Sequence, residues 1–170
     1  FNYTRHNRAE DFIDRGWILL LTAFSLTALR DALPNMLAYL ATGNSYSRNA
    51  MMLCIGGDIL QFAGLAFLLI GLLKKLNFGH LGMLAVAVAL NAAGYLLNGV
   101  QTGCYVADQF LGYFWGTYSE DFFPLFHWFI FPVMGYVFGD WYKRLADKDT
   151  FFLIAVPLCS LFAIGAILIE

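Results

Sequence analysis

The chain has 170 residues, of which 60% are hydrophobic, 18% aromatic and only 13% charged, and its mean hydropathy is +0.65. Soluble domains carry roughly 25% charged and about 45–50% apolar residues, so this composition predicts an integral membrane protein surrounded by the lipid bilayer. The formal net charge of −2 argues against a nucleic-acid partner, because no excess of Lys and Arg is available to neutralise phosphates.

Five apolar stretches approach the roughly 20 residues that a helix needs to cross a bilayer. The predicted spans are Asp11–Leu33, Ala50–Leu73, Gly79–Val100, Phe122–Phe138 and Phe151–Ile169. Pro34 is expected to end the first span, because proline disfavours helix at the residue before it. The aromatic segment 101–121 is expected to be either an interfacial belt or a re-entrant element. The sequence therefore predicts an all-α polytopic transmembrane bundle of about five spans.

Basic residues indicate how these spans are oriented. They precede the first span and follow the second and the fourth, as Arg5, Arg8, Arg15, Lys74, Lys75, Lys143, Arg144 and Lys148. The opposite side holds only Arg48 and the edge residue Arg30. We therefore expect a multi-pass protein with a cytoplasmic N-terminus, in the inner membrane if the source is bacterial.

The two ends and the cysteines give weaker information. The polar N-terminus has no short apolar core with a cleavage site, so it is not a signal peptide. Because the chain lacks an initiator Met and stops directly after an apolar run, we expect a fragment, with a single transmembrane domain over residues 1–170. Cys54, Cys104 and Cys159 show no metal-binding spacing, so we expect free thiols and no metal.

A histidine, His127, lies inside the aromatic run EDFFPLFHWFIFPVMGYVFGDW, between Pro124 and Pro132. An ionisable side chain is costly in hydrocarbon, so it usually faces protein or water and often marks a functional site. At 1.5 Å per residue, His127 lies about 8 Å and Asp58 about 12 Å below the outer ends of their predicted spans. We expect both to face a water-filled cavity open to the outside, where His127 would act as a base assisted by Asp58.

Further polar residues at similar depth are candidates for binding an acceptor, namely Asn91, Asn98 and Arg30. Each candidate also has a structural interpretation that the sequence leaves open. His127 could hydrogen-bond to a neighbouring helix, and the two asparagines could join helices in the same way. Asp58 could form a structural ion pair with Arg30, or Arg30 could snorkel to the membrane surface.

Three segments together resemble a known family. They are FIDRGWILLL, GDILQFAGLAFLLIGLLKKL and FFPLFHWFIFPVMGYVFG, which occur in this order between about Asp11 and Trp141. They are similar to membrane-bound acyltransferases of the heparan-alpha-glucosaminide N-acetyltransferase type, of which they would form the N-terminal half. The resemblance implies transfer of an acyl group from a cytoplasmic acyl-CoA to an extracytoplasmic saccharide or other envelope acceptor, with a histidine as the acid–base or acyl-carrying residue.

The resemblance also implies a role for Arg15, as a donor-side or structural residue at the cytoplasmic end of the first span. The chain departs from the family where many relatives have a histidine near the far end of that helix, since TAFSLTALRD has none. Either His127 takes this role, or the residue lies in missing chain, or the protein is not an active acyltransferase. The alternative is a non-enzymatic membrane protein, such as a transporter or flippase half or a partner subunit. A homo-oligomer also stays open.

Overall fold

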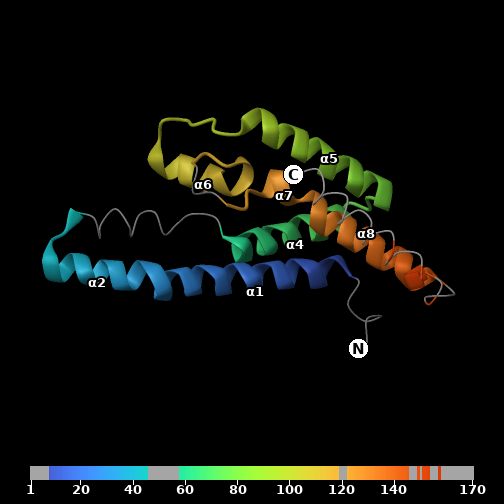
Figure 1. Cartoon of the computed structure of the whole chain (residues 1–170), viewed down its shortest axis with the longest axis horizontal. Helices are drawn as coiled ribbons and strands as arrows, with labels where there is room; N and C mark the ends of the chain where they lie inside the picture. Colours follow the sequence, from blue (N-terminus) through green and yellow to red (C-terminus); the bar gives the residue numbers. More distant parts are fainter. Residues whose placement is uncertain are drawn as a thin grey trace. The chain divides into compact units, whose positions relative to one another are not determined.

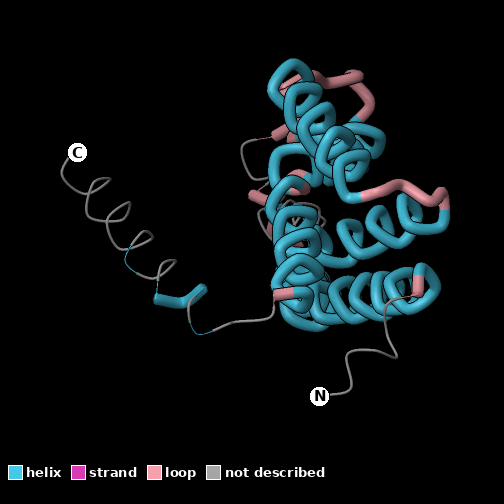
Figure 2. Tube along the Cα trace, turned by 90° about the vertical axis from the view of Figure 1, so that its right-hand side faces the viewer, coloured by secondary structure: helices cyan, strands magenta, loops and turns pink. Residues whose placement is uncertain are grey.

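The computed structural model describes residues 8–45, 58–118, 122–145, 149, 151–153 and 157. Within these residues every regular element is helical, as Figure 2 shows, which confirms the predicted all-α class. The backbone forms two compact units, Phe1–Met134 and Gly135–Glu170. The candidate site lies entirely within the first unit.

The longest helical run spans 34 residues, Ala9–Thr42. It consists of α1 (Ala9–Thr27), the π-helical turn η2 (Ala28–Ala32) and α2 (Leu33–Thr42). The prediction that Pro34 ends the first span is wrong, because the π turn shifts the hydrogen-bond register just before the proline. The N–H of Leu33 donates to the Ala28 carbonyl five residues back, and Pro34 then falls in the first turn of α2, where its missing N–H costs little. The run ends at Gly43, whose φ is +66°.

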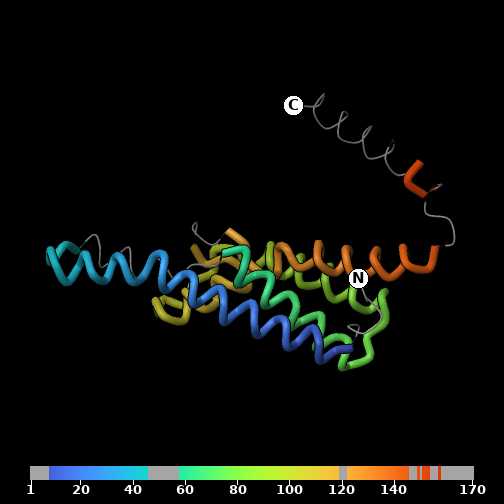
Figure 3. The backbone as a smooth tube through the Cα atoms, turned by 90° about the horizontal axis from the view of Figure 1, so that it is seen from below, coloured from blue at the N-terminus to red at the C-terminus, as the bar shows by residue number. Residues whose placement is uncertain are grey.

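Helix α4 (Ile59–Lys75) packs antiparallel against α1, and Figures 1 and 3 show the two side by side. Two glycines bring their backbones together. A Cβ on Gly16 would lie 2.9 Å from the carbonyl oxygen of Gly64, and one on Gly64 would lie 3.1 Å from that of Gly16. Close packing of α1 against α4 therefore explains the glycine of the Arg15–Gly16 pair.

The remaining helices of the first unit surround the site. Helix α5 (His80–Leu97) agrees with the predicted third span to within three residues at either end. Helix α6 (Tyr105–Trp115) lies in the predicted aromatic loop. The predicted fourth span is instead two helices, α7 (Leu125–Trp128) and α8 (Ile130–Arg144), which meet at Phe129.

Two helical runs in the described residues are long and apolar enough to cross a membrane, Ala9–Thr42 and His80–Leu97. Many of their large apolar side chains are exposed, including Leu21 (66%) and Leu81 (84%), which suits contact with lipid. The start of the second predicted span and most of the fifth lie outside the described residues. The number of five spans therefore stays a prediction.

The second unit contains the C-terminal part of α8. Its aromatic side chains form a cluster in which the ring of Phe138 contacts those of Trp141, Tyr142 and Phe151, at centroid distances of 5.9–6.0 Å. Helix α8 passes Gly139, where the fourth span was predicted to close, and ends in the basic pair Lys143 and Arg144. Arg144 donates to Asp140 at 2.7 Å, one turn earlier.

Candidate functional site

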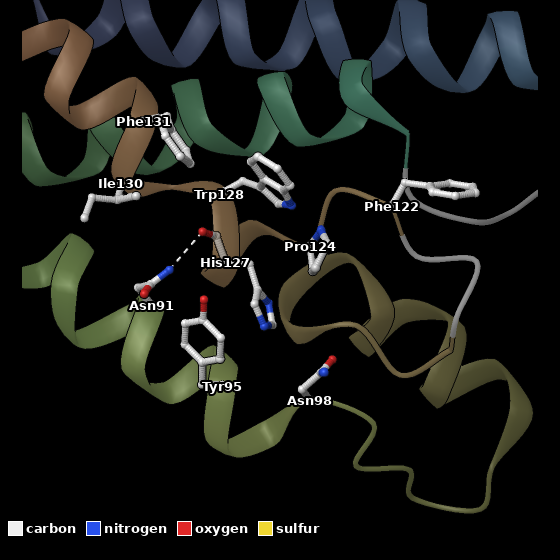
Figure 4. A pocket seen from close by; sticks show the side chains of 9 residues that line it. All are labelled: Asn91, Tyr95, Asn98, Phe122, Pro124, His127, Trp128, Ile130 and Phe131. Atoms are coloured by element: carbon white, nitrogen blue, oxygen red, sulfur yellow. Dashed lines mark hydrogen bonds between the residues drawn. The ribbon is translucent and has the colours of Figure 1, made fainter. Parts of the chain in front are cut away.

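A pocket of about 570 Å³ lies between α5, α7 and the start of α8 (Figure 4). Its lining combines amide, phenol and imidazole groups with large aromatic rings. The lining residues are Asn91, Tyr95, Asn98, Phe122, Pro124, His127, Trp128, Ile130 and Phe131. Apolar walls with a few convergent polar groups are typical of sites for small ligands. The pocket therefore offers hydrogen bonds and flat apolar surfaces to the same ligand.

Two prolines place His127 on a short, isolated turn of helix. Pro124 precedes α7, and its carbonyl accepts hydrogen bonds from the backbone N–H groups of His127 (3.2 Å) and Trp128 (3.3 Å). Pro132 has no N–H to donate to the Trp128 carbonyl four residues earlier, which explains why the helix breaks at Phe129. The segment FPLFHWFIFP thus presents an imidazole on a single turn beside α5.

His127 contacts α5 through both its backbone carbonyl and its imidazole ring. Asn91 Nδ2 donates to the backbone carbonyl of His127 at 2.9 Å, and the Tyr95 ring packs edge-on against the imidazole at a centroid distance of 5.3 Å. His127 Nδ1 is buried and has no hydrogen-bond partner among the described residues. A buried nitrogen without a partner is unusual in folded proteins and asks for an explanation.

The C-terminal ends of α5 and α6 meet beside the pocket. Asn98 follows the last residue of α5, and a Cβ on Gly116 would lie 3.4 Å from both Asn98 Oδ1 and Pro124 Cγ. The N–H of Gly99 donates to the Gly116 carbonyl at 2.9 Å. Two lining residues, Asn98 and Pro124, thus lie against the same glycine at the end of α6.

Asp108, in the first turn of α6, holds the loop between α5 and α6 by hydrogen bonds. Its carboxylate is buried and accepts hydrogen bonds from the Thr102 N–H (2.6 Å), the Thr102 hydroxyl (2.7 Å) and the Gly103 N–H (3.2 Å). These hydrogen bonds hold the pKa of the Asp108 carboxyl below its usual value, and the two from Thr102 have the largest effect. Burial acts in the opposite direction but does not outweigh them. The Thr117 hydroxyl also donates to the Asp108 backbone carbonyl at 2.7 Å.

Sequence analysis did not single out Asp108. No capping motif in the sequence marks it, because Thr102 lies six residues before Asp108 and the N-cap residue Cys104 makes no side-chain hydrogen bond. The aromatic lining residues Phe122, Trp128 and Phe131 were missed as well. They belong to an aromatic-rich run in which periodicity could not separate pocket walls from lipid-facing positions.

The structure brings three of the predicted site residues together. Asn91, Asn98 and His127 all line the one pocket. Asp58 is not among the lining residues. It is the N-cap of α4, where its carboxylate accepts from the N–H of Ile59 at 2.7 Å and Gln61 Oε1 accepts from the Asp58 N–H at 3.3 Å.

The two predicted arginines also lie outside the pocket lining. Arg30 belongs to the π turn and pairs with Asp31 at 2.9 Å, with 72% of its side chain exposed. The suggested ion pair between Arg30 and Asp58 is not among the ion pairs of the described residues. Arg15 is exposed on α1. The described residues also contain no group of three His, Cys, Asp or Glu side chains that could hold a metal ion.

A comparison with known protein families gave a match. Residues 1–167 match the family described as heparan-alpha-glucosaminide N-acetyltransferase, catalytic. The chain belongs to this family. The match confirms the resemblance drawn from the Arg15–Gly16 helix and the His127 segment, and it covers more of the chain than those motifs do. Membership indicates an acetyltransferase that acts on saccharides. No curated protein and no solved structure gave a significant match.

Proposed function

We propose that the chain transfers an acetyl group from acetyl-CoA to a saccharide or other envelope acceptor that binds in the His127 pocket. The observation that carries the proposal is the pocket itself, which joins an imidazole to two amides and several aromatic rings in a chain of this family. Amide groups match the paired donors and acceptors of sugar hydroxyls, and aromatic rings match the apolar faces of a pyranose. Asn91 and Asn98 are the proposed acceptor ligands.

The proposed reaction is a direct acyl transfer. The acceptor oxygen or nitrogen bonds to the thioester carbonyl carbon, and the carbon–sulfur bond of acetyl-CoA breaks. His127 takes the proton of the attacking group and returns it to the departing CoA thiolate, so that atoms and charge balance. A histidine suits this exchange because its unperturbed pKa lies near neutrality.

The topology of the reaction belongs to the same proposal. We infer a multi-pass arrangement with a cytoplasmic N-terminus, in which the donor approaches from the cytoplasm and the acceptor from the other side. Support comes from the distribution of Lys and Arg and from the two helical runs that are long enough to span. In this proposal Arg15 binds the donor, which the family motif supports, and Arg30 binds the acceptor, which its predicted depth supports.

The test measures transfer from radiolabelled acetyl-CoA to methyl β-D-glucosaminide and methyl β-D-glucoside by the full chain in nanodiscs. His127→Ala is expected to lower kcat by about 10²–10⁴-fold, as loss of a general base does. Unchanged kcat would remove His127 from the mechanism. Absence of transfer by the unmodified chain to either glycoside would favour the non-enzymatic alternative.

The same assay decides the role of Asp58. Asp58→Asn keeps a good N-cap for α4 but removes the carboxylate, because Asn and Asp cap helices about equally well. If Asp58 assists His127, kcat falls while thermal stability is unchanged. If Asp58 is only a cap, both stay at the level of the unmodified protein, and Asp58→Ala lowers stability by about 1 kcal/mol.

A further inference from the structure

We propose that Asn91, Gly94 and Tyr95 of α5 form a histidine seat, which fixes the His127 ring so that it meets a ligand through Nε2. Gly94 is then a positioning residue of the site, although it does not line the pocket. The inference rests on the proposed function for its catalytic meaning. The contacts that define the seat do not depend on that function.

The seat holds His127 through both its backbone and its ring. The hydrogen bond from Asn91 Nδ2 to the His127 carbonyl, 2.9 Å long, fixes the height of α7 along α5. Tyr95, one turn further along α5, packs edge-on against the imidazole. Figure 4 shows Asn91 and Tyr95 facing His127 from the same helix. Residues four apart share a face of a helix, so the two contacts restrain neighbouring parts of His127.

Gly94 supplies the surface on which the ring rests. The residue is buried, and a Cβ there would lie 3.2 Å from His127 Nδ1, 3.3 Å from Cε1 and 3.0 Å from Phe126 Cβ. A side chain at this position would therefore require the imidazole or α7 to shift by a few tenths of an ångström. The backbone conformation at Gly94 is ordinary helix, so the requirement for glycine comes from this close approach and not from φ.

The seat also explains the unpartnered nitrogen of His127. Nδ1 is buried against the backbone of α5, where the described residues offer it no hydrogen bond. A ligand in the pocket cannot approach this edge of the ring without displacing Gly94. Because His127 lines the pocket, we assign proton exchange with a bound ligand to Nε2, the other ring nitrogen.

The test compares Gly94→Ala with Gly135→Ala in the full chain in nanodiscs. Gly135 also lies within a helix, but a Cβ there would have no atom of the described residues within 4 Å. Gly94→Ala is expected to lower kcat for transfer from acetyl-CoA to methyl β-D-glucosaminide by about tenfold, because contacts of 3.0–3.3 Å require shifts of a few tenths of an ångström, less than the roughly 1 Å that costs about 10²-fold. The KM for acetyl-CoA should stay unchanged. Gly135→Ala should keep the kcat of the unmodified chain.

A second measurement does not require activity. Deuterium exchange at the imidazole Cε1–H, followed by mass spectrometry as a function of pH, should become severalfold faster for His127 in Gly94→Ala. His80 in the same molecule is the internal control and should be unaffected. Asn91→Ala removes the clamp on the His127 carbonyl without adding any atom. This variant should change the exchange of His127 in the same direction even if Gly94→Ala fails to fold.

The outcomes separate the seat from the proposed function. Unchanged His127 exchange in both variants overturns the seat, whatever the activity. Faster exchange, found together with an unmodified protein that transfers no acetyl group, supports the seat and rejects the proposed function. Faster exchange with undiminished kcat in both variants overturns the positioning role.

Discussion

Gln61, Asp108 and Thr117 are polar side chains that this apolar chain buries, and each makes hydrogen bonds that shape the first unit. Gln61 completes the capping box of α4 and donates from Nε2 to the Thr27 hydroxyl at 3.1 Å, which ties α4 to the end of α1. Asp108 holds the α5–α6 loop, and Thr117 ties the segment after α6 to the first turn of that helix. Because unsatisfied polar groups are costly away from water, these bonds specify where the helices begin and which turns they join.

Asp108→Asn is the first prediction at the residue scale. Asparagine can accept from Thr102, but its Nδ2 would face the N–H of Gly103, which is also a donor. The folded-state pKa of Asp108 is lowered, so its contribution to stability is present above its unfolded pKa and is lost as the pH falls through the folded value. The variant should have a lower melting temperature at neutral pH and a shallower loss of stability below about pH 4.

Thermal unfolding in detergent between neutral and acidic pH measures both effects. Asp31→Asn is the matched control, because it removes a carboxylate whose ion-pair partner Arg30 is largely exposed, and such pairs contribute little. The role assigned to Asp108 would be contradicted if Asp108→Asn and Asp31→Asn had the same melting temperature throughout this pH range.

At the scale of helices, hydropathy and turn residues predicted the bounds of a helix correctly where the flanking sequence is polar or contains glycine. Helix α5 is the example, since Gly79 precedes it and Asn98 follows it. Prediction failed where backbone hydrogen bonding adapted to a proline. Pro34 was predicted to end the first helix, but the helix continues past it because of the π turn at Ala28–Ala32. The sequence alone does not show which register the carbonyls before a proline will adopt.

The candidate site was predictable only in part, for a related reason. Depth along separate helices placed His127, Asn91 and Asn98 in one layer, and the structure brings them to one pocket. The same argument placed Asp58 with them, but Asp58 caps α4. Its depth was counted from a predicted helix start at Ala50, eight residues before it, whereas the described helix begins at Ile59. The depth of a residue along its helix also does not show toward which side of the helix its side chain points.

Gly16→Ala is the prediction at the scale of helix pairs. The new methyl group would lie 2.9 Å from the Gly64 carbonyl oxygen and 2.7 Å from Leu68 Cγ, so backbone as well as side chain must move. Overpacking of this kind costs about 1–3 kcal/mol. Unfolding in mixed micelles should show this loss. Gly139→Ala on α8, where a Cβ would meet no atom within 4 Å in the part of the chain that the structure describes, should instead leave stability unchanged or raise it by up to about 1 kcal/mol. Equal stability of the two variants would contradict backbone contact between α1 and α4.

At the scale of the whole chain, α5 separates two connecting segments. Its 18 residues extend over about 27 Å, close to the roughly 30 Å of a bilayer core. The turn that follows α4 contains Leu76 and comes directly after Lys74 and Lys75, whereas Cys104 lies in the loop after α5. If α5 spans the bilayer as proposed, these two loops are on opposite sides, and the basic pair places the Leu76 turn in the cytoplasm.

Cysteine labelling in intact cells tests this orientation. In a chain carrying Cys54→Ser and Cys159→Ser, the exposed thiol of Cys104 should react with a membrane-impermeant maleimide added outside. Leu76→Cys, introduced at an exposed position together with Cys104→Ser, should react only after the membrane is permeabilised. The reverse pattern would invert the orientation, so that the His127 pocket would have to be reconsidered as a donor site. Labelling of both positions from outside would show that α5 does not span the membrane, and the topology proposed for acetyl transfer would fail with it.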